Sequence, residues 1–291
     1  MYIDLKCKLP HVYAEMGRLC MKGSSLHFLN DSADVILPVG RISVIFMGPG
    51  STITHSAVKH CCWADCSIMW VGEGISKCYT VSACKSRSSE NLQRQIYVHA
   101  HEKRSLLKRY YRKRFGGLPL LGLVTEERIR GSEGSKMKKA YIECAKKYGV
   151  PWSGRMVEDA WNDQTVCNRA ISICNSYLYV ICSAVLSVLG YSTALGILHN
   201  GNMLSFSFDM ADLYKIDFSI PLGFETAAKF KFIPWDSLIE KDLRRRALNK
   251  LCEMKLLTKI LRDTEDLFGS VILPHQEHEV PDEKNIVGLS V

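Results

Sequence analysis

A long run without charged side chains is the feature that most restricts how this chain can fold. No Asp, Glu, Lys or Arg occurs between Arg169 and Asp209. Such a run suggests a membrane span, but Ser172 and other polar residues lie within it, and Gly190 and Gly196 break it up. We therefore expect a buried central helix over residues 168–189 and no association with a membrane.

The first 84 residues show a different pattern, in which short β-favouring runs are separated by Gly- and Pro-containing turns. We expect strands over residues 35–38, 42–47 and 67–71. A short helix is expected over 54–62, between two of these strands. The pattern predicts a small β-rich N-terminal domain over residues 1–85.

A polar break at residues 86–89 is expected to be a linker, and the pattern after it is helical. The fold class predicted is therefore α+β, with a larger all-helical domain over residues 86–272. The expected helices cover residues 91–115, 126–148, 168–189 and 238–267, and a further helix starts at Asp209. Residues 273–291 are expected to form a flexible tail, although their apolar end could instead add as a strand to a partner sheet.

The basic charge is concentrated in the middle of the chain. The formal net charge is +8, and residues 86–150 carry 16 Lys and Arg against 6 Asp and Glu. Arg104, Lys108 and Arg112 follow one another at helical spacing, so they share one helix face. A basic block of this kind fits a polyanionic partner without identifying it, and a solvated helix face is the equally good alternative from charge alone.

The chain has twelve cysteines and begins without an apolar leader. We therefore expect reduced thiols and a cytoplasmic protein. His60, Cys61, Cys62 and Cys66 cluster in the sequence, but no second ligand pair follows them at zinc-site spacing, so a structural zinc ion is not expected.

Three carboxylates and one histidine are candidates for chemistry. Asp209 and Asp212 lie three residues apart and share a face if helical, His199 precedes them in a turn-like segment, and Glu133 lies inside the basic block. Carboxylates with one imidazole suit Mg²⁺ or Mn²⁺. Each signal is weak by itself, because a lone histidine is commonly a packing residue and an Asp pair is commonly a solvated helix start.

Several longer motifs strengthen this interpretation. The segments concerned are Ile129-Arg-Gly-Ser-Glu-Gly-Ser135, Tyr148-Gly-Val-Pro-Trp152, Gly190-Tyr-Ser-Thr-Ala-Leu-Gly-Ile-Leu-His199, Leu204-Ser-Phe-Ser-Phe-Asp-Met-Ala-Asp212, Pro38-Val-Gly40, Gly48-Pro-Gly50, Thr54-His55 and Trp70-Val-Gly-Glu73. Together they resemble the CRISPR adaptation integrase family in its type I-E branch. The resemblance runs from about residue 10 to about residue 265.

The resemblance implies a small N-terminal β domain, a larger helical catalytic domain and a homodimer. It also implies an assembly in which two such dimers flank a dimer of a small ferredoxin-like CRISPR adaptation protein. The implied reaction inserts double-stranded protospacer DNA into the CRISPR repeat, where each 3′-hydroxyl attacks a phosphodiester. Endonuclease activity on branched DNA is implied as well.

The resemblance also implies roles for individual residues. The metal ligands carried over are Glu133, His199 and Asp212. Asp209 matches a further acidic position that either supports the ligands or serves as an alternate one. The DNA-binding candidates, which rest on the resemblance or on charge pattern, are Lys59, Lys77, Arg104, Lys108, Arg112, Arg130, Trp161 and Arg244.

Some of these assignments have alternatives. Arg130 could equally form a surface ion pair, and Trp161 could equally be a core or dimer-interface residue. Asn202 and Met16 depart from the family pattern, which often has a lysine and a tyrosine there. The alternative function is a non-catalytic DNA-binding scaffold of the same assembly, which would use the basic block alone.

Overall fold

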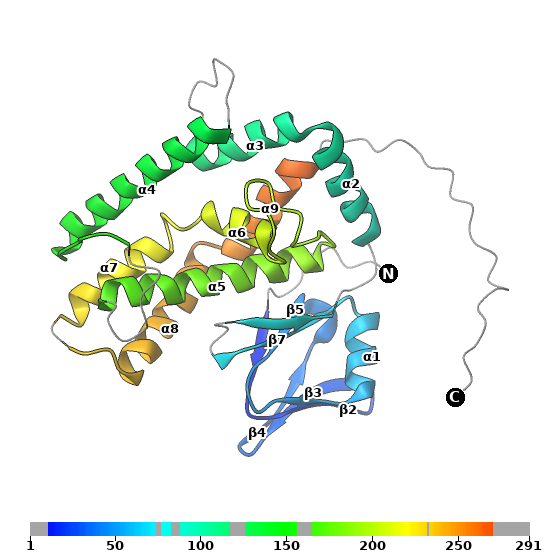
Figure 1. The fold of residues 1–291 in the computed structure, drawn as a ribbon. Helices are drawn as coiled ribbons and strands as arrows, with labels where there is room; N and C mark the ends of the chain where they lie inside the picture. Colours follow the sequence, from blue (N-terminus) through cyan, green and yellow to red (C-terminus); the bar gives the residue numbers. More distant parts are fainter. Residues whose placement is uncertain are drawn as a thin grey trace.

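Two stacked β-sheets lie on one side of a larger helical assembly, and the first of them packs against it (Figure 1). The computed structural model describes residues 11–73, 77–82, 88–116, 126–155, 165–231 and 233–269, and for residues 88, 89 and 126–133 only the backbone. The strands are β1 Val12–Ala14, β2 Arg18–Lys22, β3 Ser25–Asn30, β4 Ala33–Leu37, β5 Val44–Met47, β6 Thr52–Ile53, β7 Ser67–Val71 and β8 Cys78–Val81. The helices are α1 His55–Trp63, α2 Ser88–His101, α3 Lys103–Phe115, α4 Glu126–Tyr148, α5 Val166–Val188, α6 Ser205–Asp212, α7 Ser219–Lys229, α8 Ser237–Glu253 and α9 Leu256–Phe268.

The strands form two four-stranded sheets with the orders β1-β5-β7-β8 and β4-β3-β2-β6. In the first sheet β5 pairs in parallel with both β1 and β7. In the second sheet β2, β3 and β4 form an antiparallel meander. The helix α1 lies between β6 and β7, and Thr54 begins it by accepting a hydrogen bond from the Ala57 amide.

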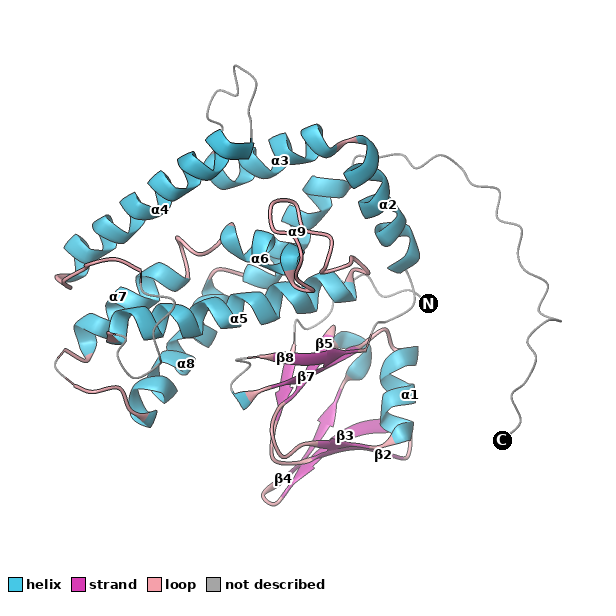
Figure 2. Cartoon of the chain, viewed as in Figure 1, coloured by secondary structure: helices cyan, strands magenta, loops and turns pink. Residues whose placement is uncertain are grey.

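Strand β5 is apolar at every position because the first sheet is covered on both faces. Ile45 and Met47 point into a core shared with the second sheet and α1. The alternate residues Val44 and Phe46 pack with Val180 and Ala184 of α5. This alternation follows from the two-residue period of a strand. Figure 2 shows the resulting order of layers, with α5 running along the outer face of the first sheet.

Helix α5 also forms the centre of the helical assembly. One of its faces packs with α2, α3, α6, α8 and α9 in the largest apolar core. Near its N-terminus Cys167 and Ile171 pack with Ala140 of α4 and with Phe224 of α7. A helix packed against protein on several faces has little room for charged side chains, which accounts for the absence of charge in α5 after Arg169 in its first turn.

The predicted fold class is confirmed, while some helix boundaries differ from the prediction. The helix expected over 91–115 is two helices, because the backbone leaves helical geometry at Glu102. The last long helix is likewise divided at Lys255, which has a left-handed conformation. Helix α7 was not predicted, and α6 begins at Ser205 and not at Asp209.

The predicted division at residues 85 and 86 falls in a segment outside the described residues, as does the tail over 273–291, so both stay predictions. Of the predicted linker, Ser88 and Ser89 are already helical. Within the described part, α5 alone is long and apolar enough to cross a membrane. This is weak evidence for a span, because α5 packs against helices on one side and the sheet on the other.

The contact between α5 and α7 yields a test of packing. A Cβ at Gly223 would collide with the side chain of Ile171. We expect Gly223→Ala to lower the free energy of unfolding by about 1–3 kcal/mol, because the buried neighbour must move. The measurement is urea denaturation followed by circular dichroism.

The control for this test is Gly134→Ala in α4, where an added Cβ meets open space. This control should stabilise the protein by about 0.5–1 kcal/mol through helix propensity. Equal effects of the two substitutions would contradict the predicted packing.

Candidate functional site

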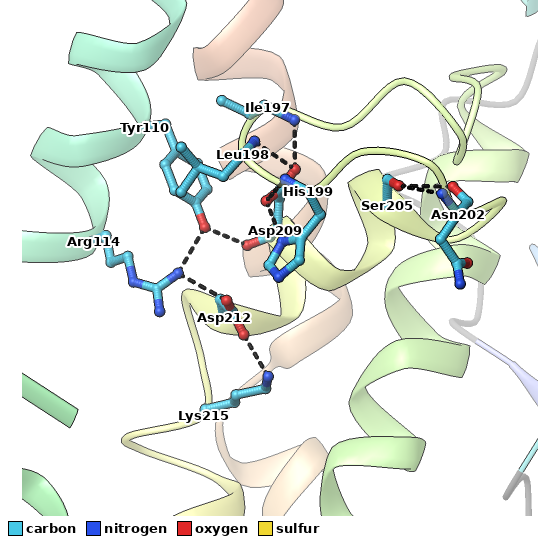
Figure 3. A network of polar contacts seen from close by, with 10 residues as sticks. All are labelled: Tyr110, Arg114, Ile197, Leu198, His199, Asn202, Ser205, Asp209, Asp212 and Lys215. Carbon is cyan, nitrogen blue, oxygen red and sulfur yellow. Dashed lines mark hydrogen bonds and ion pairs between the residues drawn. The ribbon is translucent and has the colours of Figure 1, made fainter. Parts of the chain in front are cut away.

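Asp209 is a fully buried carboxylate whose two oxygens hold the loop that precedes its own helix. Its Oδ2 accepts hydrogen bonds from the backbone amides of Ile197 and Leu198, and its Oδ1 accepts one from the amide of His199. The Nδ1 atom of the His199 ring lies 2.7 Å from the same Oδ1 (Figure 3). Asp209 therefore fixes both the loop backbone and the orientation of the imidazole.

The same loop is held from its other side by α2. Gln95 is buried, and its side-chain amide donates to the carbonyl oxygens of Ser192 and Leu195 and accepts from the Ser192 amide. Asn91 donates to the carbonyl oxygen of Leu189 at the end of α5. These contacts satisfy backbone groups that a buried turn would otherwise leave unpaired.

Gly196 is required where this loop approaches α6. A Cβ there would collide with the carbonyl oxygen of His199 and would lie 2.9 Å from Asp209 Oδ2. The loop can therefore come close enough to hydrogen bond with Asp209 only if residue 196 has no side chain. Further along, Asn202 Oδ1 accepts from the Leu204 amide just before α6 begins.

Asp212, one turn further along α6, lies between two cations. Arg114 Nη1 is 3.1 Å from Asp212 Oδ2, and Lys215 Nζ is 2.5 Å from Oδ1. Burial alone would raise the pKa of Asp212, but Lys215 and Arg114 hold it below its usual value. Burial lowers the pKa of Lys215, but the neighbouring Asp212 carboxylate outweighs this effect, so the pKa lies above its usual value. Asp212 is therefore ionised and oriented from two sides.

Tyr110 connects the surroundings of the two aspartates. Its hydroxyl donates to the backbone carbonyl of Asp209 at 2.7 Å and accepts from Arg114 Nη1 at 2.9 Å. Burial raises the pKa of this hydroxyl, so it stays protonated and can donate. Arg114, Tyr110, Asp209 and Asp212 thus form one continuous network between α3 and α6 (Figure 3).

The imidazole of His199 has one nitrogen engaged and one available. Its hydrogen bond to Asp209 raises the pKa of His199, with burial acting in the opposite sense. The side chain is 45% exposed. A carboxylate on Nδ1 orients a histidine so that its Nε2 can bind a metal ion.

Of the predicted metal-site residues, His199 contacts Asp209, and Asp212 lies one turn further along α6, while their role as ligands stays a prediction. Glu133 lies in α4, but its side chain is outside the described residues, as is that of Arg130. Trp161 also lies outside the described residues. Among the side chains that are described, no group of three or more His, Cys, Asp or Glu could hold a metal ion. His199 and Asp212 supply a nitrogen and a carboxylate, a donor chemistry that fits Mg²⁺ or Mn²⁺.

Most predicted DNA-binding residues are on the surface. Arg104, Lys108 and Arg112 are all exposed on α3, and these three residues are called the α3 stripe below. Lys77 is exposed before β8, and Lys59 is exposed on α1 with its Nζ 4.6 Å from the centre of the Trp63 ring.

Arg244 has contacts within the protein. Its Nη2 atom lies 3.6 Å from Glu73 Oε1, and it also forms a hydrogen bond with Tyr177. It therefore connects α8 with the β-rich part, and its predicted DNA contact stays a prediction.

Sequence reasoning missed four residues of the network, namely Tyr110, Arg114, Lys215 and Gln95. Arg114 was visible only as one of seven cations in α3, and nothing marked it as the one that turns inward. Lys215 could have been found from its spacing, since it follows Asp212 by three residues.

The chain matches none of the protein-family models. It is 34% identical to the CRISPR-associated endonuclease Cas1 2 of Thermus thermophilus over 94% of this chain and 84% of that protein. It is 33% identical to the CRISPR-associated endonuclease Cas1 2 of Chlorobaculum tepidum over 91% of this chain and 90% of that protein. The chain belongs to the Cas1 family. A crystal structure of a TtCas1–DNA complex has a TM-score of 0.76 and 33% identity to this Cas1-family chain, covering 90% of it and 97% of the other.

These relationships confirm the resemblance found in the sequence motifs, and the more specific assignment to the type I-E branch stays a prediction. They also agree with the observed architecture, because the solved Cas1 structure aligns with both the sheets and the helices of this chain. The network around Asp209 and Asp212 therefore belongs to a Cas1-family protein.

The role of Asp209 can be tested through stability. We expect Asp209→Asn to lower the free energy of unfolding by about 2 kcal/mol or more, because a buried amide replaces a carboxylate that accepts four hydrogen bonds. Urea denaturation measures the change. The control is Asp217→Asn at an exposed site in the same segment, expected to change stability by less than about 0.5 kcal/mol. Similar values for both variants would show that Asp209 does not hold the loop.

Proposed function

We propose that this Cas1-family protein is a divalent-metal-dependent DNA integrase and endonuclease that inserts protospacer DNA into a CRISPR array. The 3′-hydroxyl oxygen of the fragment forms a new bond to phosphorus at the repeat boundary. The 3′-oxygen of the repeat strand leaves, so one phosphodiester replaces another. The observation that carries the proposal is the Asp209–His199 pair, which leaves Nε2 of a half-exposed imidazole beside the ionised Asp212.

The proposed ligands of Mg²⁺ or Mn²⁺ are Glu133, His199 and Asp212. When bound, the ion would polarise a phosphoryl oxygen and help activate the attacking hydroxyl. Asp209 keeps the His199 ring in place and is not itself a ligand in this proposal, because its oxygens already accept four hydrogen bonds. Arg114 and Lys215 keep Asp212 in its charged form.

The α3 stripe supports the choice of DNA as substrate. The three exposed cations lie on the same helix as Arg114, whose side chain reaches Asp212. Arg114 lies two residues beyond Arg112 and is buried on the opposite face of α3, so the stripe supports DNA binding through its charge and exposure. Further proposed contacts come from Lys59, Lys77, Arg130, Trp161 and Arg244.

The proposed partners are double-stranded protospacer and repeat DNA, a second copy of the chain and a central dimer of a small ferredoxin-like CRISPR adaptation protein. The crystal structure of the TtCas1–DNA complex supports DNA binding in the family. We propose a cytoplasmic location for the assembly. The division into domains over residues 1–85 and 86–272, followed by a tail, is part of the same proposal.

The enzymatic part of the proposal is tested by strand transfer. In an assay with supercoiled repeat-bearing DNA, the purified partner and Mn²⁺ or Mg²⁺, we expect labelled fragment to enter the plasmid. Glu133→Ala and His199→Ala should each reduce the rate by at least about 100-fold, because each loses a metal ligand. Excess chelator should have the same effect, and Asp217→Asn should react at the wild-type rate.

DNA binding by the same proteins distinguishes the enzyme from a scaffold. An enzyme loses strand transfer in the Glu133 and His199 variants while it still binds DNA. If folded wild-type protein binds DNA but gives no product with either metal ion, the non-catalytic scaffold is the correct function.

The α3 stripe is tested through salt dependence. Each phosphate neutralised contributes about −0.9 to the slope of log K against log salt concentration. Replacing Arg104, Lys108 and Arg112 together by Ala should therefore reduce the magnitude of this slope by up to about 2.7. Fluorescence anisotropy with a labelled duplex measures it. Lys241→Ala, at an exposed position on α8, is the control, and an unchanged slope in the triple variant would exclude the stripe as a DNA contact.

A further inference from the structure

The carboxylate of Asp212 is shared between two cations that differ in how firmly they are held. The side chains of Arg114 and Asp212 are 4% and 5% exposed, while that of Lys215 is 17% exposed. Each cation takes a different oxygen, with Arg114 on Oδ2 and Lys215 on Oδ1. A metal ion that binds Asp212 must therefore share this carboxylate with one of the cations or displace it.

Arg114 is fixed in place by contacts besides the one to Asp212. The same Nη1 atom donates to Tyr110, whose hydroxyl is bonded to the Asp209 backbone. The backbone carbonyl of Arg114 accepts a hydrogen bond from Lys136 of α4 at 2.6 Å. Moving the guanidinium would break this network and leave buried charges without partners, which is costly.

Lys215 has another partner to which it can turn. Its Nζ lies 5.0 Å from the centre of the Tyr179 ring on α5, and it also forms a hydrogen bond with Tyr179. A lysine ammonium on its four-carbon stem can be reoriented more easily than a planar guanidinium held at two points. If the Lys215 ammonium moves away from Asp212, it therefore keeps a favourable contact with the Tyr179 ring.

The charges around Asp212 indicate that Lys215 moves away from this carboxylate when a metal ion binds. The single negative charge of Asp212 is already paired with two cations, Arg114 and Lys215, in the absence of a metal ion. A divalent cation at Asp212 would add two positive charges beside the Lys215 ammonium. Like charges at short distance in a poorly solvated site repel strongly.

We propose that Lys215 takes the place of the metal ion in the metal-free protein. Its ammonium occupies Asp212 Oδ1 until the ion binds and then gives up this oxygen, while Arg114 stays on Oδ2. Lys215 thereby keeps the ligand charged and oriented before the ion arrives and competes with the ion for it. This inference rests on the metal-dependent function proposed above.

The test measures the affinity of the full-length protein for Mn²⁺ alone, without DNA, after prior removal of bound metal. Free Mn²⁺ is counted by electron paramagnetic resonance. We expect Lys215→Met to bind Mn²⁺ about tenfold more tightly than the wild type, because the competing charge has been removed. Lys22→Met, which disrupts an exposed lysine–aspartate pair with Asp34, should leave the affinity unchanged.

Thermal unfolding provides a second measurement on the same proteins. Without metal, Lys215→Met should melt at a lower temperature than the wild type, because Asp212 has lost a buried partner. Saturating Mn²⁺ should raise the melting temperature more in this variant than in the wild type. If Lys215 had a purely structural role, the variant would melt at a lower temperature without metal, but Mn²⁺ would stabilise it no more than the wild type.

Two negative results have different meanings. If wild-type protein binds Mn²⁺ and His199→Ala does not, unchanged or weaker binding by Lys215→Met overturns the exchange and leaves the metal site intact. If His199→Ala binds Mn²⁺ as well as the wild type, the proposed metal site is wrong and the exchange is overturned with it. Should Lys215→Met fail to fold, Lys215→Gln gives the same comparison, because it removes the charge and keeps a donor.

Discussion

The contact of α5 with protein on all sides is the constraint on which the rest of the structure depends. One face of this helix completes the helical core, and another covers the outer face of the β1-β5-β7-β8 sheet. Because little of this helix is left for solvent, its only charged residue is Arg169 in the first turn, and the rest of the helix is uncharged. The loop that leaves α5 therefore begins deep in the protein, where α2 and α6 supply its hydrogen bonds.

Two carboxylates one turn apart on α6 acquire different properties from their surroundings. Asp209 receives hydrogen bonds from three backbone amides and one imidazole, and it orders a loop. Asp212 receives two full positive charges, which keep it ionised in a buried place. The same side-chain chemistry thus gives a structural anchor at one position and a candidate ligand at the other.

The large features of the fold could be predicted because each follows from the local sequence. The uncharged run indicated the central helix, and the three-residue spacing placed Asp209 and Asp212 on one face. The direction of Asp209 could not be predicted, since its partners lie in a loop whose path depends on Gln95 of a distant helix. The role of Arg114 could not be predicted for a similar reason, because only packing decides which cation of α3 turns inward.

Gly196 has a consequence for recognising related chains. A search for His199 and the two aspartates alone would find many sequences by chance, since His and Asp are common residues. A glycine three positions before the histidine adds a steric condition, because any Cβ there would prevent the loop from closing on Asp209. A sequence filter that requires this glycine would therefore select for the geometry of the loop, beyond the identity of the ligands.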